Sequence, residues 1–206
     1  MWWPPWPLLW ATAFDVGRDM ALIGYTLDAA LARLRALAWR ALGVRSATHA
    51  KAHAGSRVRC AWGHGELGAG AELYRDVQVL CTGAGRFHLG ARSHIAPGGY
   101  LLVGASRLHI GAGVAIGPQV AIFCEANGAR AGVPFVEQHV SAPVHIGDNV
   151  FLGARVTVLP GAVIERDVVV AAHAVVRGRL ASGFVYGGVP ARALHPLRPA
   201  ERPDPS

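Results

Sequence analysis

The sequence predicts an all-β protein, a parallel β-solenoid, with one α-helix in front of it. The first observation is a period of six over residues 146–181, where aliphatic residues open successive blocks. They are Ile146, Leu152, Val158, Ile164, Val170 and Val176. The second is glycine in the second place of many blocks, and the third is a helical spacing of leucines over residues 13–43. Hexapeptide blocks of this kind form β-solenoids, with about 18 residues in each three-block coil.

Length, composition and charge narrow the class of protein. A chain of 206 residues with 52% hydrophobic residues suits one domain with an appendage. The net charge is +7, but the arginines are spread along the chain and no basic run alternates with aromatics. This distribution argues against nucleic acid as a partner and favours anionic small molecules or a membrane surface.

The cysteines give no sign of a disulfide framework or a zinc site. Cys60, Cys81 and Cys124 are far apart, odd in number and include no CxxC pair. We expect three reduced, buried side chains, and therefore a reducing compartment and a cytoplasmic protein.

The two ends of the chain differ from the rest. Residues 1–12 form a segment rich in tryptophan and proline, with no basic residue in front of it, and it matches a signal peptide poorly. No apolar run reaches the ~18 residues of a transmembrane helix. Residues 196–206 contain four prolines and are expected to be a flexible tail.

Residues 13–43 are predicted to form an amphipathic helix that ends at Gly43. One face carries Leu27, Leu31, Leu34, Ala38 and Leu42. Two interpretations remain open. The helix packs on the body of the protein or on another subunit, as amphipathic helices usually do. Alternatively, its arginines and the nearby tryptophans hold it at a membrane interface as a peripheral contact.

The solenoid is predicted to span residues 57–195, after a linker at 44–56. Earlier sets of aliphatic residues six apart, separated by short slips, support this start. They are Leu67, Leu73 and Val79; Leu89, Ile95 and Leu101; and Ile110, Ile116 and Ile122. One long insertion, residues 123–143, interrupts the repeats.

A period of six with glycine in the second place excludes an ordinary helix or a coiled coil. Those structures need periods of about 3.6 or seven, and glycine and proline oppose both. Three blocks per coil give the solenoid the shape of a three-sided prism. The leading aliphatic residue of each block should point into this prism and stack on the equivalent residues of the coils above and below. The small second residue leaves room for the turn.

The motifs "PVHIGDNVFLGARVTVLPGAVIERDVVVAAHAVVRG" and "GGVPAR" resemble the hexapeptide-repeat O-acetyltransferases of the maltose, galactoside and polysaccharide-sugar type. The resemblance covers roughly residues 57–195. It implies a left-handed parallel β-helix, an exception to the right-handed crossover rule. It also implies a homotrimer with active sites between subunits and acetyl-CoA, or another acyl-CoA, as co-substrate.

The same resemblance implies which residues of this chain would contact coenzyme A. Ala154 and Ala172 match the small residues that coenzyme A touches along the prism edge. A polar or basic stretch after the last strand corresponds to Arg177, Gly178 and Arg179. The closing GGVPAR segment places Arg192 near the nucleotide phosphates, which arginine binds well.

The histidine that would act as general base in such enzymes has no counterpart at the matching position of this sequence. The histidine that removes the acceptor proton is expected at Asn127, or at Gly128 after a slip of one residue, and neither side chain titrates in the useful range. His139, in the same loop, is the first alternative, and His145, directly before a block-opening isoleucine, is the second. If the insertion occupies no coil, His145 and His109 should stack on adjacent coils.

Two function classes follow from these residues. The first is a coenzyme A-dependent O-acyltransferase, in particular an acetyltransferase, acting on a sugar hydroxyl of a surface polysaccharide or glycolipid, with a small-molecule or lipid-linked sugar as acceptor. The second is a β-helix scaffold or regulatory subunit that lacks the usual catalytic histidine. No metal site is expected, because the short histidine spacing of β-helical carbonic anhydrases is absent: five residues separate His139 from His145.

Overall fold

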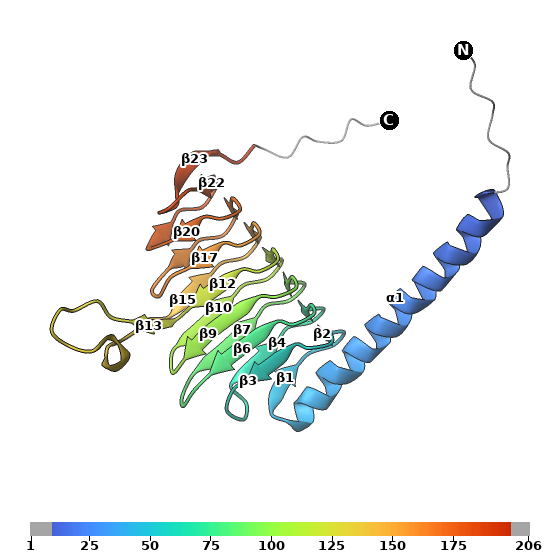
Figure 1. The fold of residues 1–206 in the computed structure, drawn as a ribbon, viewed down its shortest axis with the longest axis horizontal. Coiled ribbons are helices and arrows are strands. Elements are labelled where there is room, and N and C mark those ends of the chain that lie inside the picture. Colours follow the sequence, from blue (N-terminus) through green and yellow to red (C-terminus); the bar gives the residue numbers. More distant parts are fainter. Residues whose placement is uncertain (1–9, 199–206) are drawn as a thin grey trace, which may run out of the picture.

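The computed structural model describes residues 10–198, with side-chain surroundings from Thr26 onward. It is a left-handed parallel β-helix with three walls, preceded by helix α1, Trp10–Ala41 (Figure 1). The predicted fold class is confirmed. The predicted segment 1–12 and tail 196–206 lie largely outside the described residues.

Each wall is a parallel sheet built from every third strand of the solenoid. Sheet A contains β1 (Val44–Ser46), β4 (Gly65–Leu67), β7 (Arg86–Leu89), β10 (Arg107–Ile110), β15 (Val144–Ile146), β18 (Val163–Ile164) and β21 (Arg179–Leu180). Sheet B contains β2 (Lys51–Ala52), β5 (Glu72–Leu73), β8 (His94–Ile95), β11 (Ala115–Ile116), β16 (Val150–Leu152), β19 (Val168–Val170), β22 (Phe184–Gly187) and the antiparallel β23 (Arg192–Pro196). Sheet C contains β3 (Arg57–Arg59), β6 (Gln78–Cys81), β9 (Tyr100–Gly104), β12 (Ala121–Phe123), β17 (Thr157–Val158) and β20 (Val175–Val176).

The core is the column of side chains predicted from the period of six. The block-opening residues from Leu67 to Val176 are fully buried, and the fifth residue of each block in the 146–181 run is buried beside them. Register places these residues directly above one another, as in Ile110 next to Ile146 and Ile146 next to Ile164. Each coil therefore buries its apolar face only because a neighbouring coil covers it.

The second-place glycines are needed where two coils approach each other. A Cβ built on Gly153 would lie 2.5 Å from the backbone nitrogen of Ala172, and one on Gly117 would lie 2.8 Å from that of Ala154. A side chain cannot fit at either position without moving backbone. Close packing of coils, rather than an unusual turn conformation, explains these glycines.

The solenoid begins earlier than the sequence indicated. Residues 44–56 are not a linker: they contain β1 and β2, which pair in parallel with β4 and β5. The pattern is hidden because alanines, Ala50 and Ala52, occupy the buried positions of this first coil. Small side chains suffice there because Ala36 of α1 is part of the same core cluster.

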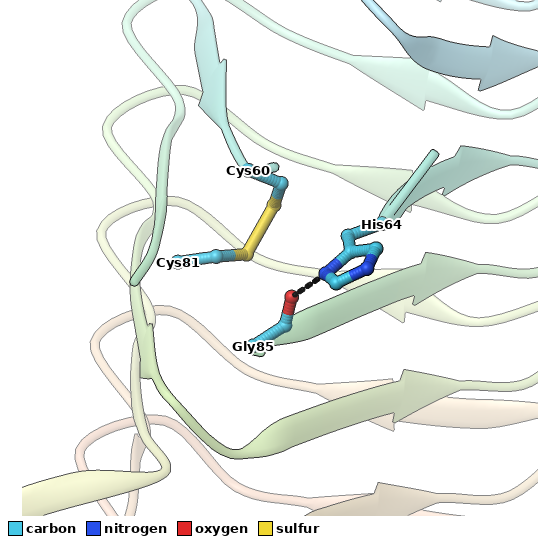
Figure 2. Close-up of a disulfide and its surroundings, with 4 residues drawn as sticks. All are labelled: Cys60, His64, Cys81 and Gly85. Atoms are coloured by element: carbon cyan, nitrogen blue, oxygen red, sulfur yellow. Dashed lines mark hydrogen bonds between the residues drawn. A yellow bond between two sulfur atoms is a disulfide. The ribbon is translucent and has the colours of Figure 1, made fainter. Parts of the chain in front are cut away.

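The expectation of three free cysteines is wrong for two of them. Cys60 and Cys81 form a disulfide with a Cα–Cα distance of 4.7 Å, beside a hydrogen bond from His64 Nδ1 to the carbonyl oxygen of Gly85 (Figure 2). The two cysteines follow paired positions of β3 and β6, so the solenoid brings together residues 21 apart in sequence. With two of the three cysteines joined in a disulfide, the cysteines no longer indicate a reducing compartment.

The third cysteine behaves as predicted. Cys124 is a free, buried thiol, and burial raises its pKa to about 11. A thiol with this pKa stays protonated and does not act as a nucleophile near neutral pH.

The face of α1 that contacts the solenoid is not the leucine face. Ala32 and Ala36 are buried against the first coil, whereas Leu27, Leu31 and Leu34 are about half exposed or more. The helix therefore packs on the body of this chain, as one of the two interpretations had it, but through its alanines and not through its leucines. Alanines are used instead because they let the helix backbone lie close to β1 and β2.

A cluster of polar side chains, here called the clasp, fixes α1 on the first coils. Asp28 Oδ2 lies 3.2 Å from His53 Nδ1 and 3.3 Å from Arg75 Nη2, and Glu72 Oε1 lies 2.6 Å from His53 Nε2. These contacts lower the pKa of Asp28, chiefly through the hydrogen bond with His53. Ser46 Oγ adds a bond of 2.9 Å to the carbonyl oxygen of Ala36.

The insertion leaves the prism as a hairpin. β13 (Glu125–Asn127) pairs with the antiparallel β14 (His139–Ser141), and a short 3-10 helix, Phe135–Glu137, lies between them. It projects from the corner where sheet C passes into sheet A (Figure 1). Among the described residues, no helix is long and apolar enough to cross a membrane.

Two neighbouring residues of β16 test the account of the core. Leu152 points inward and is fully buried, whereas Phe151 points outward and is 47% exposed. We expect Leu152→Ala to lower the free energy of unfolding by about 2–5 kcal/mol, because it leaves a cavity between coils. Phe151→Ala should change it by no more than about 0.5 kcal/mol. Equal losses in urea unfolding would contradict the predicted column of inward side chains.

Candidate functional site

The hairpin places two of the predicted catalytic residues opposite each other. Asn127 of β13 is the register partner of His139 of β14. Glu125, two residues before Asn127, lies with its Oε1 3.9 Å from His139 Nδ1. The site therefore contains an imidazole, a carboxylate beside one of its nitrogens, and an amide across the strand pair.

A glycine of the neighbouring coil makes room for the carboxylate. Gly104, at the end of β9, has a φ of +58°, and a Cβ built there would overlap Glu125 Oε2. Glu125 thus lies against bare backbone at the root of the hairpin and is only partly exposed. This position holds the carboxylate close to the prism while His139 remains open to solvent.

Gln138 organises the loop beyond the strands. Its side-chain oxygen accepts a hydrogen bond of 2.7 Å from Arg130 N, and its amide donates to the carbonyl oxygens of Arg130 and Val133 at 2.9 and 2.8 Å. A hollow of about 240 Å³ results, with His139 and Gln138 among its walls. The buried amide keeps the loop in one shape next to the imidazole.

This arrangement fits general base catalysis. The carboxylate lies on the Nδ1 side of the ring, near enough to attract a positively charged imidazolium, and Nε2 is left free to accept a proton. His139 is exposed, so a hydroxyl group can reach Nε2. Asn127 does not titrate, but its amide can orient a bound group.

The second candidate, His145, belongs to a different feature. The rings of His88, His109 and His145 stack in parallel along sheet A, with centroids 4.8 and 4.9 Å apart. The predicted stacking of His145 and His109 on adjacent coils is confirmed, because the insertion occupies no coil between β10 and β15. We call these three residues the histidine ladder.

The middle ring of the ladder has a perturbed pKa. Loss of water around the ring lowers the pKa of His109, and repulsion from His88 and His145 lowers it further. Asp148 and Glu66 act in the opposite direction.

A hollow of about 600 Å³ lies beside His109 and His145 and is also lined by Glu165, Arg179 and Ser182. Glu165 accepts hydrogen bonds from Ser182 N at 3.0 Å and from Arg179 Nε at 2.7 Å, and both lower its pKa. Arg179, a predicted cofactor contact, is therefore already paired with a carboxylate.

The remaining cofactor candidates lie at two corners of the prism. Ala154 and Ala172 stack at the corner between sheets B and C, where Ala154 O accepts a hydrogen bond from His173 N. The closing segment reaches the same corner, because Ala191 N donates to Val175 O. This brings the exposed Arg192 into the neighbourhood of Ala172.

Arg177 and Gly178 lie at the corner between sheets C and A instead. Gly178 O accepts a hydrogen bond from Val163 N. The hairpin leaves the prism at this corner, and Ala142 at its end lies against Gly161 of the next coil. Sheet C therefore separates these two residues and the His139 hairpin from the corner that holds Ala154, Ala172 and Arg192.

Sequence reasoning missed Glu125 and the ladder's third member, His88. Glu125 could not be identified from the sequence, because the strand pairing of a hairpin inserted between the repeats follows no regular spacing of residue types. His88 could have been added from the spacing, since it precedes Leu89 as His109 precedes Ile110. Among the described residues, no group of three or more histidine, cysteine or acidic side chains is arranged to hold a metal ion.

Comparison with known proteins supports the interpretation of the six-residue spacing as the hexapeptide repeat of bacterial transferases. Residues 143–178 match the bacterial transferase hexapeptide model, described as six repeats. The chain carries this transferase repeat. Over 54 residues, the chain is 50% identical to a protein of Escherichia coli K12 named as a lipopolysaccharide biosynthesis O-acetyl transferase, WbbJ. A further 55-residue match, at 38% identity, is to a protein of Mycobacterium tuberculosis named as an acetyltransferase.

These matches cover 26% and 27% of this chain and 28% and 18% of the two relatives. Solved structures extend the likeness across the solenoid. A maltose O-acetyltransferase from Clostridium difficile 630 has a TM-score of 0.58 at 25% identity, covering 65% of this chain and 70% of that one. A galactoside acetyltransferase in complex with coenzyme A has a TM-score of 0.52 at 25% identity, over 54% and 56% of the chains.

The histidine ladder makes stability depend on pH. Because the pKa of His109 is lowered on folding, the unfolded chain binds more protons just below the ordinary histidine pKa. Stability should fall as the pH drops from about 8 to about 5.5. His109→Gln should reduce that loss, whereas His195→Gln, on exposed β23, should not. An unchanged pH dependence of the urea midpoint in His109→Gln would contradict this assignment.

Proposed function

We propose that the protein is a coenzyme A-dependent O-acyltransferase, most specifically an acetyltransferase that acts on a sugar hydroxyl in surface polysaccharide or glycolipid synthesis. The observation that carries the proposal is the Glu125–His139 pair on a hairpin of a transferase-type hexapeptide prism. The acceptor class follows the names of WbbJ and of the maltose and galactoside enzymes.

In this mechanism, His139 Nε2 removes the proton of the acceptor hydroxyl as its oxygen attacks the thioester carbonyl of acetyl-CoA. The negative charge of Glu125, on the Nδ1 side of the ring, stabilises the imidazolium that forms. Collapse of the tetrahedral intermediate releases coenzyme A as the leaving thiol, which regains a proton from His139. The acceptor leaves as its acetyl ester.

The co-substrate is proposed to lie along the corner of Ala154 and Ala172. Small side chains there let an extended ligand approach the backbone, and Arg192 supplies positive charge for its phosphates. Arg177 and Gly178 lie at the other edge of sheet C and face the hairpin's side of the prism. Arg179 is a weaker candidate, because Glu165 already pairs with it.

We further propose a homotrimer with its sites between subunits. In one chain, sheet C separates His139 from the Arg192 corner, so the hairpin of one subunit would serve the corner of a neighbour. An acyl-CoA co-substrate also fits a cytoplasmic protein, and a lipid-linked acceptor fits peripheral membrane contact through the N-terminal segment.

A specific observation favours one alternative. The family's usual histidine position holds Asn127, or Gly128 after a slip of one residue, so a scaffold or regulatory subunit that binds acyl-CoA without transferring the acyl group is the second candidate. It predicts ligand binding without turnover for any acceptor.

Substitutions in the hairpin separate the two candidates. With a sugar acceptor and acetyl-CoA, His139→Ala should lower kcat by about 10²–10⁴-fold, the usual contribution of a general base. Glu125→Gln should lower it less and leave the KM for acetyl-CoA unchanged. His195→Ala, an exposed histidine of β23, is the control. Full activity in His139→Ala would remove His139 from the mechanism.

Complementation tests the shared site. His139→Ala and Arg192→Ala proteins are unfolded and refolded together to form mixed oligomers, and they are assayed at low acetyl-CoA, where each is impaired alone. Partial recovery of activity is expected, because some sites then combine an intact hairpin with an intact corner from the neighbour. Recovery no greater than that of two separately refolded samples would mean that each site lies within one subunit.

A further inference from the structure

The outward face of α1 is a continuous strip of leucines. Leu27, Leu31, Leu34 and Leu37 are 59%, 49%, 61% and 57% exposed. Their spacing of three or four places them on one side of the helix, and Ala38 extends the same side. We call these five residues the leucine strip. An exposed apolar strip of this kind on an ordered helix marks a contact surface.

The orientation of the strip is fixed by the protein itself. The clasp holds Asp28 against His53 and Arg75, and the buried Ala32 and Ala36 lie against the first coil. The helix cannot turn the leucines inward without breaking these contacts. Figure 1 shows α1 at the β1 and β2 end of the prism, running outward from it toward the N-terminus.

Positive charge borders the leucine strip. Arg33 and Arg40 are four residues before and three after Leu37, and all three line one hollow of about 260 Å³ with Ser46 and His49. No acidic residue lines that hollow. A larger hollow of about 470 Å³ adjoins it, shares Arg40, and includes Trp62, which is 74% exposed.

We propose that the leucine strip and its arginine-lined hollow dock the protein on an anionic lipid surface. The leucines enter the boundary of the acyl chains, and Arg33 and Arg40 bind lipid phosphates in the hollow. Trp62 lies at the level of the headgroups, where tryptophan is favoured. This surface is separate from the His139 hairpin, so the inference does not depend on acyl transfer.

Charge favours lipid over a second copy of the chain. Over residues 26–41 the helix carries Arg33, Arg35 and Arg40 and a single acid, Asp28, which the clasp already uses. Two leucine strips packed together would bring their bordering arginines close without acids to pair with them. Lipid phosphates supply the missing negative charge.

Vesicle sedimentation of the full chain tests the proposal. Vesicles of phosphatidylglycerol and phosphatidylcholine in equal parts are compared with vesicles of phosphatidylcholine alone. Wild-type protein should bind the anionic vesicles, and added salt should weaken binding. Leu31→Glu/Leu34→Glu and Arg33→Glu/Arg40→Glu should each weaken binding at least about tenfold. Arg57→Glu/Arg59→Glu, exposed on β3, makes the same charge change outside α1 and the leucine strip and should have a smaller effect.

Each result of the sedimentation experiment either supports or overturns docking on an anionic lipid surface. The altered side chains are exposed, so the variants should melt with the wild type, and Leu31→Ser/Leu34→Ser is a milder second variant if the first does not. No vesicle binding by wild-type protein overturns the proposal. So does equal weakening by the β3 control, which would show attraction by net charge alone. Leucine variants that bind vesicles normally but change oligomeric state in light scattering would assign the strip to a second copy.

Discussion

The structure depends on one constraint: each coil must cover the apolar face of the next while their backbones lie in contact. Inward residues such as Ile146 and Leu152 stack through the prism, and Gly153 allows the following coil to approach. No coil buries its core alone, so the regular spacing has to persist along the whole solenoid. Functional side chains are therefore confined to outward positions, corners and insertions.

The same constraint decides how the candidate site is built. An insertion can leave only at a corner without breaking a stack, and the 123–143 segment does so between sheets C and A. Its own strand pair then sets Asn127 opposite His139 and brings Glu125 to the root of the hairpin. Stacking also explains the histidine ladder, because equivalent outward positions of successive coils repeat at the spacing of the sheet.

Those features of the fold that follow the six-residue repeat could be predicted from the sequence, and those that do not follow it could not. The inward aliphatics and the stacking of His109 on His145 could be predicted, because a six-residue repeat fixes both. The first coil could not, because Ala50 and Ala52 carry too little hydrophobic contrast. Nor could the Cys60–Cys81 bond, since slips between blocks hide that they follow paired strand positions. The leucines of α1 predicted the helix but not its buried face, which depends on the clasp and on small residues.

The most direct test of the central claim, that this prism is built to hold acyl-CoA at the Ala154–Ala172 corner, is calorimetric titration with acetyl-CoA. The account predicts saturable binding by the wild-type protein and clearly weaker binding by Arg192→Ala, with Arg166→Ala, an exposed arginine of another corner, unchanged. Absence of binding in the wild type, or equal affinity in Arg192→Ala, would contradict it.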